Sequence, residues 1–447
     1  MIPQLWNDLQ GTFFSESALD FMPVPQLRAV QLQRLQAAVT LAYEKVPLFH
    51  SRMDEKKLTP ADIRTLTDVS KLPFTVKTDL RDTYPYGLFA VPMSDVVRLH
   101  ASSGTTGKPI VVGYTAQDMK VWEQVIMRSL YAAGYSRGDI VQNMYGYGLF
   151  TGGLGLHGGL EAIGATVIPI SGGNSERQIM VMKDFGVTAV CCTPSYFIHL
   201  IEVAQKMGID FKRDLKVKRG VFGAEPWTNE MRQYIETASG IKAYDIYGLS
   251  EIIGPGVACE CECQTGPHIF EDHFLAEIVD PKTLEPVPDG TEGELVITTL
   301  SKQAMPVIRY RTRDITSLDN TACGCGRTCR RIKRISRRSD DMFIIRGVNV
   351  YPSQIEVALL KTEASLPHYQ IVLTRKGSLD QMEVRVEITG EMLRDNVGAM
   401  EQLQKNFGRS IEQVTGLHAN VTLAEPGSIP RSEGKAKRLL DQRTQTK

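Results

Sequence analysis

Short apolar runs alternate with amphipathic stretches between about residues 96 and 240, and this alternation limits the possible folds more than any other feature. The runs DIVQNM, GATVIPI and VTAVCCT are separated by a glycine-rich segment and by a helical stretch that ends at Phe185. Strands that alternate with helices are typical of β-α units on a mostly parallel sheet. We therefore expect a large α/β domain in the N-terminal part of the chain.

The chain has 447 residues, which is too long for one hydrophobic core of ordinary size. Apolar residues at helical spacing predict a helix over residues 27–60. Between residues 268 and 320 the pattern changes to strands separated by turn residues, as in HFLAEIVD and GELVITTL. This change predicts a β-rich part of the large domain at about residues 255–335.

A separate α+β domain is predicted for the C-terminal residues. The runs FIIRG, YQIVLTR and MEVRVEI have the composition of strands, and a long helix is expected from Glu391 to about Val414. We place the boundary at Asp340, so that residues 1–339 form the large domain and residues 340–447 the small one, near the usual domain size.

The charge balance argues against polyanionic partners. Lys plus Arg and Asp plus Glu each total 51, so no net field favours nucleic acid or an acidic membrane. The N-terminal residues Met1 to Phe14 do not resemble a signal peptide, and no apolar stretch is long enough to span a bilayer. We expect a cytoplasmic protein. A nucleic-acid-binding module stays as an alternative, because seven basic residues lie between Arg327 and Arg338.

The segment SSGTTGKP follows the apolar run Val96 to Leu99 and has the composition of a phosphate-binding loop. Two glycines free the backbone to curl around an anion, four hydroxyls donate hydrogen bonds and a lysine adds charge. Its glycines are too close together for a Walker A loop, and a flexible surface turn is the alternative. The candidate residues are Ser102, Ser103, Gly104, Thr105, Thr106, Gly107 and Lys108.

Three more segments end predicted strands, where α/β sheets bind ligands. They are FGAEPW (Phe222 to Trp227), DIYGLSE (Asp245 to Glu251) and YRTRD (Tyr310 to Asp314). Tyr247 offers a flat face for a purine, and Glu251 offers a carboxylate for Mg²⁺. Asp314 could accept both hydroxyls of a ribose, although a surface ion pair with Arg311 or Arg313 is the alternative.

These four segments, followed by RSDDMFIIRGVN and PRSEGKAKR, resemble in their order the adenylate-forming superfamily of acyl-CoA synthetases. YGYGLFTGGLG, PISGGNSERQ, TPSY and VIRYRTRD are similar to phenylacetate–CoA ligases, and the resemblance runs from Trp6 to about Asp441. It implies the adenylate-forming fold with a mobile C-terminal domain. It also implies ATP-dependent ligation of phenylacetate or a similar aryl acid to CoA through an acyl-adenylate, with release of AMP and pyrophosphate. An adenylating enzyme that loads a carrier-protein thiol is the alternative.

The resemblance also implies roles for single residues. Lys435 and Glu251 would act in catalysis, the latter through Mg²⁺, and Asp340 would be the hinge. Arg337 departs from the family, which usually has glycine there. The aryl acid would lie against Tyr145, Tyr147, Phe150 and Gly152. Besides the phosphate loop, ATP would contact Gly223, Ala224, Glu225, Pro226, Asp245, Ile246, Tyr247, Gly248, Asp314, Ile335 and Arg338.

Six of the eight cysteines form two short groups, which favours a metal over disulfides in a reducing compartment. Cys261 and His268 lie seven residues apart across a Gly-Pro turn, and Cys323 and Cys325 offer a second pair. A structural Cys₃His zinc site is therefore predicted, with unligated thiols as the alternative. The nearby Cys259, Cys263 and Cys329 leave the ligand set open. The oligomeric state also stays open, with a homodimer as one alternative.

Overall fold

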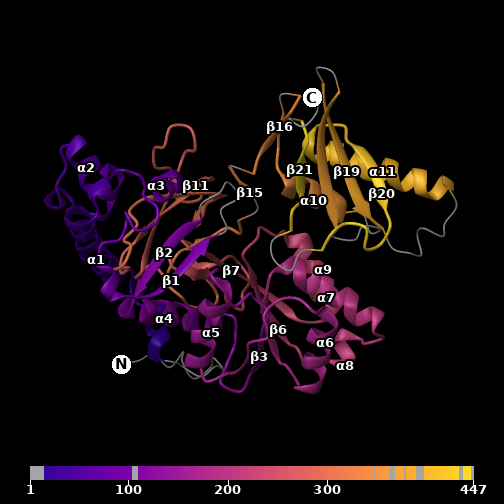
Figure 1. Ribbon diagram of the computed structural model, residues 1–447, viewed down its shortest axis with the longest axis horizontal. Coiled ribbons are helices and arrows are strands. Elements are labelled where there is room, and N and C mark those ends of the chain that lie inside the picture. The colour runs from indigo at the N-terminus through magenta and orange to yellow at the C-terminus, as the bar shows by residue number, and fades with distance from the viewer. Residues whose placement is uncertain are drawn as a thin grey trace.

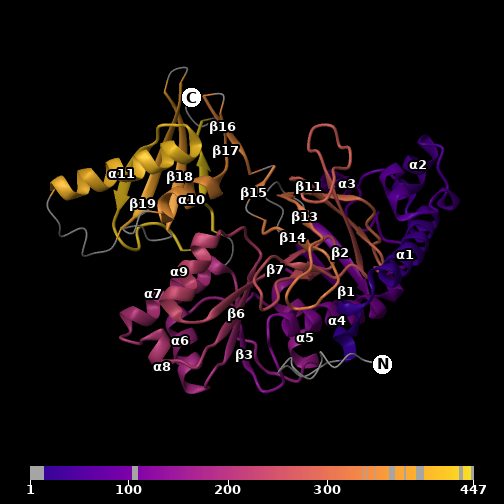
Figure 2. The ribbon, with the colours of Figure 1, turned by 180° about the vertical axis from the view of Figure 1, so that it is seen from behind.

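The computed structural model describes two domains (Figures 1 and 2). The small C-terminal domain, coloured orange to yellow, lies against helices α7 and α9 of the large domain. No helix among the described residues has the length and apolar character needed to cross a membrane. The described residues are 15–102, 109–335, 337–339, 341–346, 348–361, 368–376, 379–388, 397–431 and 436–443.

A nine-stranded sheet forms the centre of the large domain, with the order β13-β14-β9-β8-β7-β6-β5-β3-β4 in the described residues. Its parallel strands are β3 (Ile140–Asn143), β4 (Thr166–Ile168), β5 (Ala189–Cys192), β6 (Arg219–Gly223) and β7 (Lys242–Leu249). The helices between them are α5 (Gly152–Ala162), α6 (Ser175–Asp184), α7 (Pro194–Lys206), α8 (Phe211–Asp214) and α9 (Asn229–Ser239). The α/β fold predicted from the alternating runs is confirmed, because these strands are covered by helices.

The strands of the predicted β-rich part belong to two sheets. Four of them extend the nine-stranded sheet in antiparallel fashion: β8 (Gly254–Cys259), β9 (His268–Ile269), β13 (Leu318–Asp319) and β14 (Arg331–Ile332). A second, antiparallel sheet contains β10 (Phe274–Val279), β11 (Gly293–Thr299), β12 (Tyr310–Thr316) and β15 (Arg337–Arg338). A separate hairpin pairs β1 (Val96–Ser102) with β2 (Ile110–Thr115). The chain thus crosses between the two sheets within this part.

The single helix predicted over residues 27–60 is wrong, since two helices occupy it. They are α1 (Val24–Lys45) and α2 (Pro47–Glu55), with Val46 in an extended conformation between them. Proline excludes the helical conformation for the residue before it and has no N–H to continue a helix, so Pro47 ends α1 and begins α2. Short helical turns and α3 (Lys77–Asp82) follow before the hairpin.

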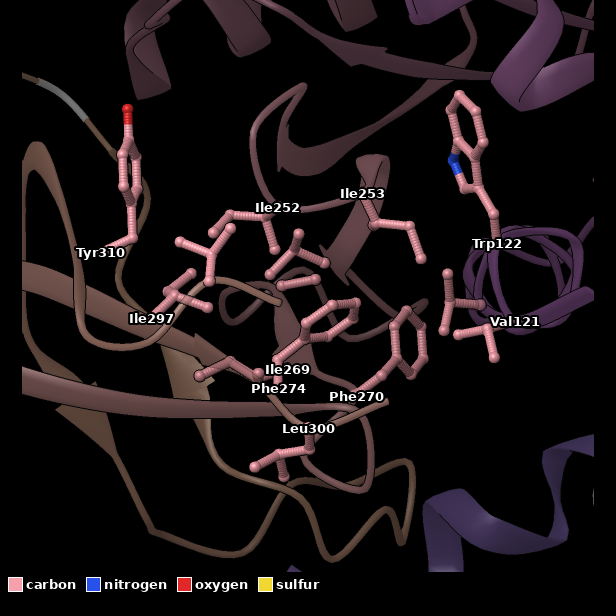
Figure 3. Close-up of a cluster of buried hydrophobic side chains, with 14 of the residues drawn as sticks. Val121, Trp122, Ile252, Ile253, Ile269, Phe270, Phe274, Ile297, Leu300 and Tyr310 are labelled. Carbon is pink, nitrogen blue, oxygen red and sulfur yellow. The ribbon is translucent and has the colours of Figure 1, made fainter. Parts of the chain in front are cut away.

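A buried apolar cluster joins α4 (Ala116–Ala132) to both sheets (Figure 3). Trp122 of α4 stacks on Tyr114 of β2 with ring centroids 4.8 Å apart, and its indole N–H donates to the Pro255 carbonyl at 3.0 Å. Phe270 and Phe274 fill the space between α4 and the second sheet. The ends of strands from different sheets are therefore held on one rigid core.

The small domain has its own hydrophobic core, built from Phe343 to Ala419. Its four-stranded sheet contains β18 (Tyr369–Lys376), β19 (Leu379–Glu387), β20 (Asn420–Ala424) and β21 (Leu439–Asp441), with the hairpin β16 (Phe343–Ile345) and β17 (Val348–Val350) beside it. Helices α10 (Pro352–Leu360) and α11 (Val397–Thr415) complete it. The helix predicted from Glu391 corresponds to α11, while residues 391–396 and Asp340 lie outside the described residues.

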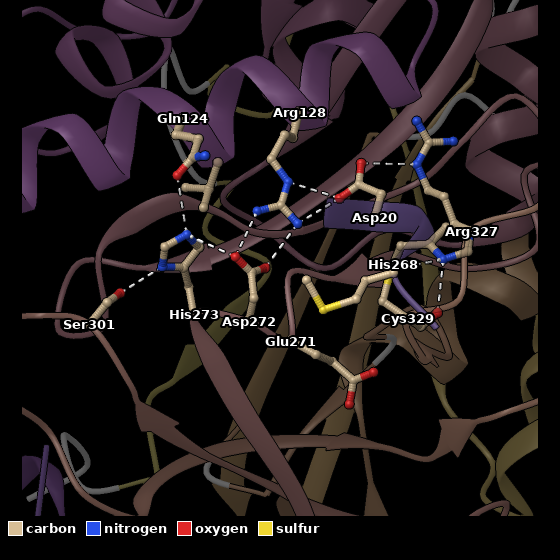
Figure 4. Close-up of polar contacts among 12 residues, drawn as sticks. Asp20, Gln124, Arg128, His268, Glu271, Asp272, His273, Ser301, Arg327 and Cys329 are labelled. Atoms are coloured by element: carbon tan, nitrogen blue, oxygen red, sulfur yellow. Dashed lines mark hydrogen bonds and ion pairs between the residues drawn. The ribbon is translucent and has the colours of Figure 1, made fainter. Parts of the chain in front are cut away.

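A buried ion network fixes the N-terminal helical turn (Ser15–Phe21) to the large domain (Figure 4). Arg128 of α4 donates to Asp20 at 2.6 Å and to Asp272 at 2.9 Å, and all three side chains are at most 1% exposed. Arg327 pairs with the second oxygen of Asp20 at 3.3 Å. Two arginines from distant parts of the chain thus depend on one carboxylate.

Replacing Asp20 with alanine should lower the free energy of unfolding of the large domain by about 3–5 kcal/mol, because among the described carboxylates the buried Arg128 would keep only Asp272 and Arg327 would lose the one that it pairs with. The shift in the urea midpoint of the large-domain transition measures this effect. Arg375→Gln, which breaks an exposed pair with Asp380, is the control and should change the midpoint little. Equal shifts in the two variants would contradict the role given to the network.

Candidate functional site

The turn after β6 lies at the carboxyl edge of the parallel sheet, and its backbone has a conformation that few residues adopt. A Cβ on Gly223 would lie 2.3 Å from the Ile246 carbonyl oxygen, so only glycine fits there. Ala224 has φ +71°, a left-handed conformation that costs energy for any residue with a side chain. Glu225 is half-buried and Pro226 is exposed. We name residues 223–226 the Ala224 turn. The surrounding structure holds this turn in a conformation that an unfolded chain would rarely adopt.

Asp314 connects three of the segments singled out in the sequence. The Tyr247 hydroxyl donates to one of its carboxylate oxygens at 2.6 Å, and Arg338 donates to the other at 2.8 Å. Tyr247 lies in β7 of the nine-stranded sheet, whereas Asp314 and Arg338 are paired in the second sheet. The alternative of a surface ion pair is wrong, because Asp314 is 3% exposed and Arg311 and Arg313 both pair with Glu294.

Asp245 of β7 is buried, and its carboxylate contacts other side chains of the protein. Its carboxylate accepts a hydrogen bond from the Trp227 indole N–H at 3.0 Å, and Arg334 lies over the Trp227 ring. Burial, and then the charge of Glu260, raise the pKa of Asp245. The geometry gives Asp245 a role in holding Trp227, and its contact with adenine stays a prediction. Ile246 and Ile335 are buried in the core, and Gly248 packs against the Gly254 carbonyl.

Glu251 follows β7 and is 5% exposed. Its backbone carbonyl accepts a hydrogen bond from the Lys302 ammonium at 3.3 Å, and Lys302 also lies 4.9 Å from the Tyr114 ring centroid. Burial lowers the pKa of Lys302 to about 8. Burial, and then the nearby Glu251 carboxylate, raise the pKa of the Tyr310 hydroxyl. Lys302 was not among the predicted site residues, because a single lysine outside any motif carries no sequence signal.

The glycine-rich segment is attached to the end of β1, after which the predicted phosphate loop begins in the sequence. The Ala101 N–H of β1 donates to the Leu149 carbonyl at 2.8 Å, so the end of β1 is fixed to this segment. Ser102 is half-buried at the end of β1, while Ser103, Gly104, Thr105, Thr106, Gly107 and Lys108 lie outside the described residues. A loop that leaves β1 here begins next to the predicted acid site.

The predicted acid-site residues occupy different environments. Tyr145 is buried, and its hydroxyl accepts from the Gly223 N–H at 3.0 Å and donates to the Cys192 carbonyl at 2.6 Å. The Tyr147 hydroxyl accepts from the Asn143 amide at 2.8 Å, and Phe150 is 40% exposed. A Cβ on Gly152 would lie 3.2 Å from the Tyr145 ring. Tyr145 and Gly152 are therefore packed together behind the segment, and Tyr147 and Phe150 reach its surface.

Two glycines of this segment serve helix packing. A Cβ on Gly155 would lie 2.3 Å from the Trp122 ring, and one on Gly159 would lie 2.1 Å from Ile126. Both positions let α5 approach α4 closely. Neither glycine therefore leaves room for a ligand at its position.

Lys435 and Asp340 lie outside the described residues, but the neighbour of Lys435 is placed. The Ala436 N–H donates to one carboxylate oxygen of Glu225 at 3.0 Å, and the Ser195 N–H donates to the other at 2.8 Å. Arg337, at the position where the family usually has glycine, pairs with Glu292 and lies 5.1 Å from the Tyr351 ring centroid. The chain that follows Lys435 thus contacts the Ala224 turn.

Four side chains converge on a candidate metal site. The ligand atoms of Cys261, His268, Cys323 and Cys325 all lie within 4.8 Å of one another. The Nε2 atom of His268 is 3.5 Å from the Cys325 sulfur, while its Nδ1 atom is 3.2 Å from the Cys329 carbonyl oxygen. Such a backbone contact fixes the ring of a metal-binding histidine. The geometry selects the predicted four residues from the cysteines that the sequence left open.

The basic run, which we define as residues 327–338, contains arginines that form ion pairs with carboxylates of the same protein. A face that binds phosphates would keep such guanidinium groups free. The structure instead pairs Arg327 with Asp20, Arg330 with Glu271, Arg331 with Asp319, Arg334 with Glu260, Arg337 with Glu292 and Arg338 with Asp314. The observation behind the nucleic-acid-binding alternative is thus explained by internal pairing.

Comparison with known proteins shows which family the chain resembles. Residues 24–305 match the family model described as AMP-binding enzyme, and residues 347–443 match the AMP-binding enzyme C-terminal domain. Phenylacetate-coenzyme A ligase of Thermus thermophilus is 51% identical over 439 residues, which cover 95% of this chain and 98% of that protein. The ligase of the same name from Escherichia coli strain K12 is 51% identical over 421 residues, which cover 94% and 96%.

One related ligase has been solved in two states that differ in the arrangement of its domains, and this chain can be compared with both. The 2-hydroxyisobutyryl-CoA ligase with 2-HIB-AMP in the postadenylation state matches with TM-score 0.88, at 29% identity over 95% of this chain and 91% of that chain. With 2-HIB-AMP and CoA in the thioesterification state, it matches with TM-score 0.71, at 30% identity over 95% and 92%. Since identity and coverage are nearly equal, the domains of this chain are arranged more as in the first state. We name this the postadenylation-like arrangement.

Proposed function

The chain belongs to the phenylacetate–CoA ligase family of AMP-binding enzymes, and from that premise we propose that its acid substrate is phenylacetate or a similar aryl acid. The chain is an ATP-dependent acyl-CoA ligase that works through an acyl-adenylate. The observation that carries the aryl acid is the pair of aromatic rings, Tyr147 and Phe150, at the surface of the glycine-rich segment that is attached to the end of β1. Flat apolar rings favour a flat apolar ligand.

Formation of the acyl-adenylate requires groups that bind the ribose and offset the phosphate charge, and Asp314 and Glu251 suit these two roles. A carboxylate is a poor electrophile, so its oxygen must attack the α-phosphate of ATP, which releases pyrophosphate and leaves a mixed anhydride that a thiol can cleave. We assign Asp314 to the ribose, because its buried carboxylate is fixed by Tyr247 and Arg338. Glu251 offers a carboxylate that suits Mg²⁺, which would offset negative charge on the phosphates.

Turnover across a panel of acids tests the substrate proposal. With ATP and CoA, phenylacetate and related single-ring acids should give a higher kcat/KM than octanoate of similar size. The aromatic rings of Tyr147 and Phe150 are the reason for this preference. Better turnover of octanoate would overturn the aryl acid and leave the ligase activity standing.

Gly152→Leu should raise the KM for the acid about tenfold or more and leave the KM for ATP nearly unchanged. The added side chain would press on the Tyr145 ring, only 3.2 Å from the first added carbon, and push it toward the acid site. Gly158→Leu is the matched control, because a Cβ there meets nothing within 4 Å. Initial rates at varied acid and varied ATP separate the two constants, and equal increases in both would indicate a packing role instead.

We propose in addition that Cys261, His268, Cys323 and Cys325 hold one structural zinc ion. Three thiolates and one imidazole are a donor set that zinc prefers, and four protein ligands leave no open position for a substrate. The fixed Nδ1 atom of His268 leaves Nε2 for the metal. The ion would therefore contribute to folding and not to the reaction.

A further inference from the structure

A cluster of charged side chains lies across the boundary between the two domains. Glu202 of α7 belongs to the large domain, and its carboxylate contacts two residues of the small domain. The His368 Nε2 atom is 2.6 Å from one oxygen, and the Arg431 guanidinium is 3.2 Å from the other. We name Glu202, His368 and Arg431 the Glu202 latch.

The two partners of Glu202 are rigid parts of the small domain. Arg431 donates to both carboxylate oxygens of Glu387 at 2.7 Å, and the Glu387 side chain is fully buried. The His368 carbonyl accepts the Glu387 N–H at 3.0 Å, so both partners share one support. Glu202 is the member of the latch that the other domain supplies. Any rotation of the small domain must therefore break the contacts with Glu202.

The latch lies next to the segment that carries Lys435. Arg431 is four residues before this lysine, and Ala436 directly follows it. Arg431 is attached to α7 through Glu202, and Ala436 is attached to the Ala224 turn through Glu225. Carboxylates of the large domain thus bind the described residues on both sides of Lys435, Arg431 and Ala436, in the postadenylation-like arrangement.

The energetic cost of leaving this arrangement falls on Glu202. Its side chain is 12% exposed and that of His368 is 7% exposed. On rotation of the small domain the Glu202 carboxylate would keep, among its described partners, only His199 of its own helix, 3.8 Å away, so the contacts with His368 and Arg431 favour one of the two domain arrangements over the other. A group that contacts only one state shifts the equilibrium toward that state.

We infer that Glu202 is a positioning residue for adenylation: it holds the small domain where Ala436, the residue after Lys435, is bound to Glu225 of the Ala224 turn, and it releases that domain for thioester formation. The inference rests on the proposed function, because it assumes that Lys435 acts during adenylation. Glu202 itself does not touch the reacting atoms in this account.

Glu202→Gln tests the latch, because it keeps the size of the side chain and removes its charge. Acid-dependent exchange of pyrophosphate into ATP should fall about tenfold, within the usual range for coupling between two states. Thioester formation from supplied acyl-adenylate and CoA should stay at the wild-type rate or rise. Glu383→Gln is the matched control, since Glu383 pairs with Arg385 and Thr422 within the small domain. An equal loss in both half-reactions, or no loss in either, would overturn the inference.

His368→Gln, alone and combined with Glu202→Gln, measures whether His368 and Glu202 act together. The loss in the double variant should be smaller than the product of the two single losses, because either change breaks the same contact. Independent losses that multiply would contradict a shared latch.

A distance measurement separates the latch from the proposed function. Spin labels on unnatural amino acids at the exposed Met180 of α6 and the exposed Lys405 of α11 report the domain arrangement without turnover. The wild type should show a main distance for the postadenylation-like arrangement, and Glu202→Gln should lose part of that population. If the wild type exchanges no pyrophosphate with any aryl acid, the proposed function fails while this shift can still be seen. An unchanged distance distribution in Glu202→Gln would overturn the latch alone.

Discussion

Replacing Lys435 with alanine is expected to slow formation of the acyl-adenylate by about a hundredfold or more, as is usual when one preorganised electrostatic group is lost. A cation next to the acid and the α-phosphate stabilises the charge that develops in the transition state more than that of the ground state. The Ala436 N–H bound to Glu225 supports this position, because it puts the chain after Lys435 at the Ala224 turn.

The two half-reactions should respond differently to this change. We propose that thioester formation needs the small domain rotated and Lys435 away from the site, so that supplied acyl-adenylate should still react with CoA. Pyrophosphate exchange and single-turnover thioester formation measure the two steps separately. Lys437→Ala is the control, since Lys437 is exposed two residues further on. Equal slowing of both steps in Lys435→Ala, or of neither, would be incompatible with alternation of the domains.

Cys325→Ser should release the zinc and lower the stability of the large domain by several kcal/mol, because a structural zinc ion contributes its binding energy to folding. The serine keeps the shape of the side chain and loses the thiolate that zinc prefers. Metal content of the purified protein and its urea midpoint measure the two effects. Cys263→Ser is the control, since Cys263 is exposed and is not one of the four converging residues.

The zinc assignment has a separate outcome that would refute it. If metal analysis of purified wild-type protein finds no zinc and all eight thiols titrate, the four residues hold no metal. Loss of turnover in Cys325→Ser with zinc and stability retained would instead give this residue a part in the reaction, against the closed site proposed for it.

The sequence predicted those parts of the fold that depend on the hydrophobic pattern within a single strand or helix. The runs at β3, β4 and β5 were apolar enough to predict a mostly parallel sheet, because strands of such a sheet pack against helices on both faces. The boundary between α1 and α2 was missed, although Pro47 was its signal, because the apolar spacing continues across the break. Local spacing alone did not predict which strands of residues 255–335 join which sheet.

Site residues were predicted where a motif marks them and missed where only tertiary contacts matter. Tyr247, Asp314 and Arg338 belong to three separate segments, and the structure brings them together. Glu202 and Lys302 are single charged residues in ordinary helical or loop sequence, and only burial against distant partners shows their significance. For the same reason the basic run around Arg330 resembled a binding face until its distant carboxylates were placed.

The release of AMP from ATP and phenylacetate, measured with and without CoA, tests the central claim most directly. We predict that AMP forms only when phenylacetate is present, that CoA accelerates its release many-fold, and that one phenylacetyl-CoA appears for each AMP. AMP release that CoA does not accelerate would favour an enzyme that loads a carrier-protein thiol. An absence of phenylacetate-dependent AMP with CoA present would contradict the account.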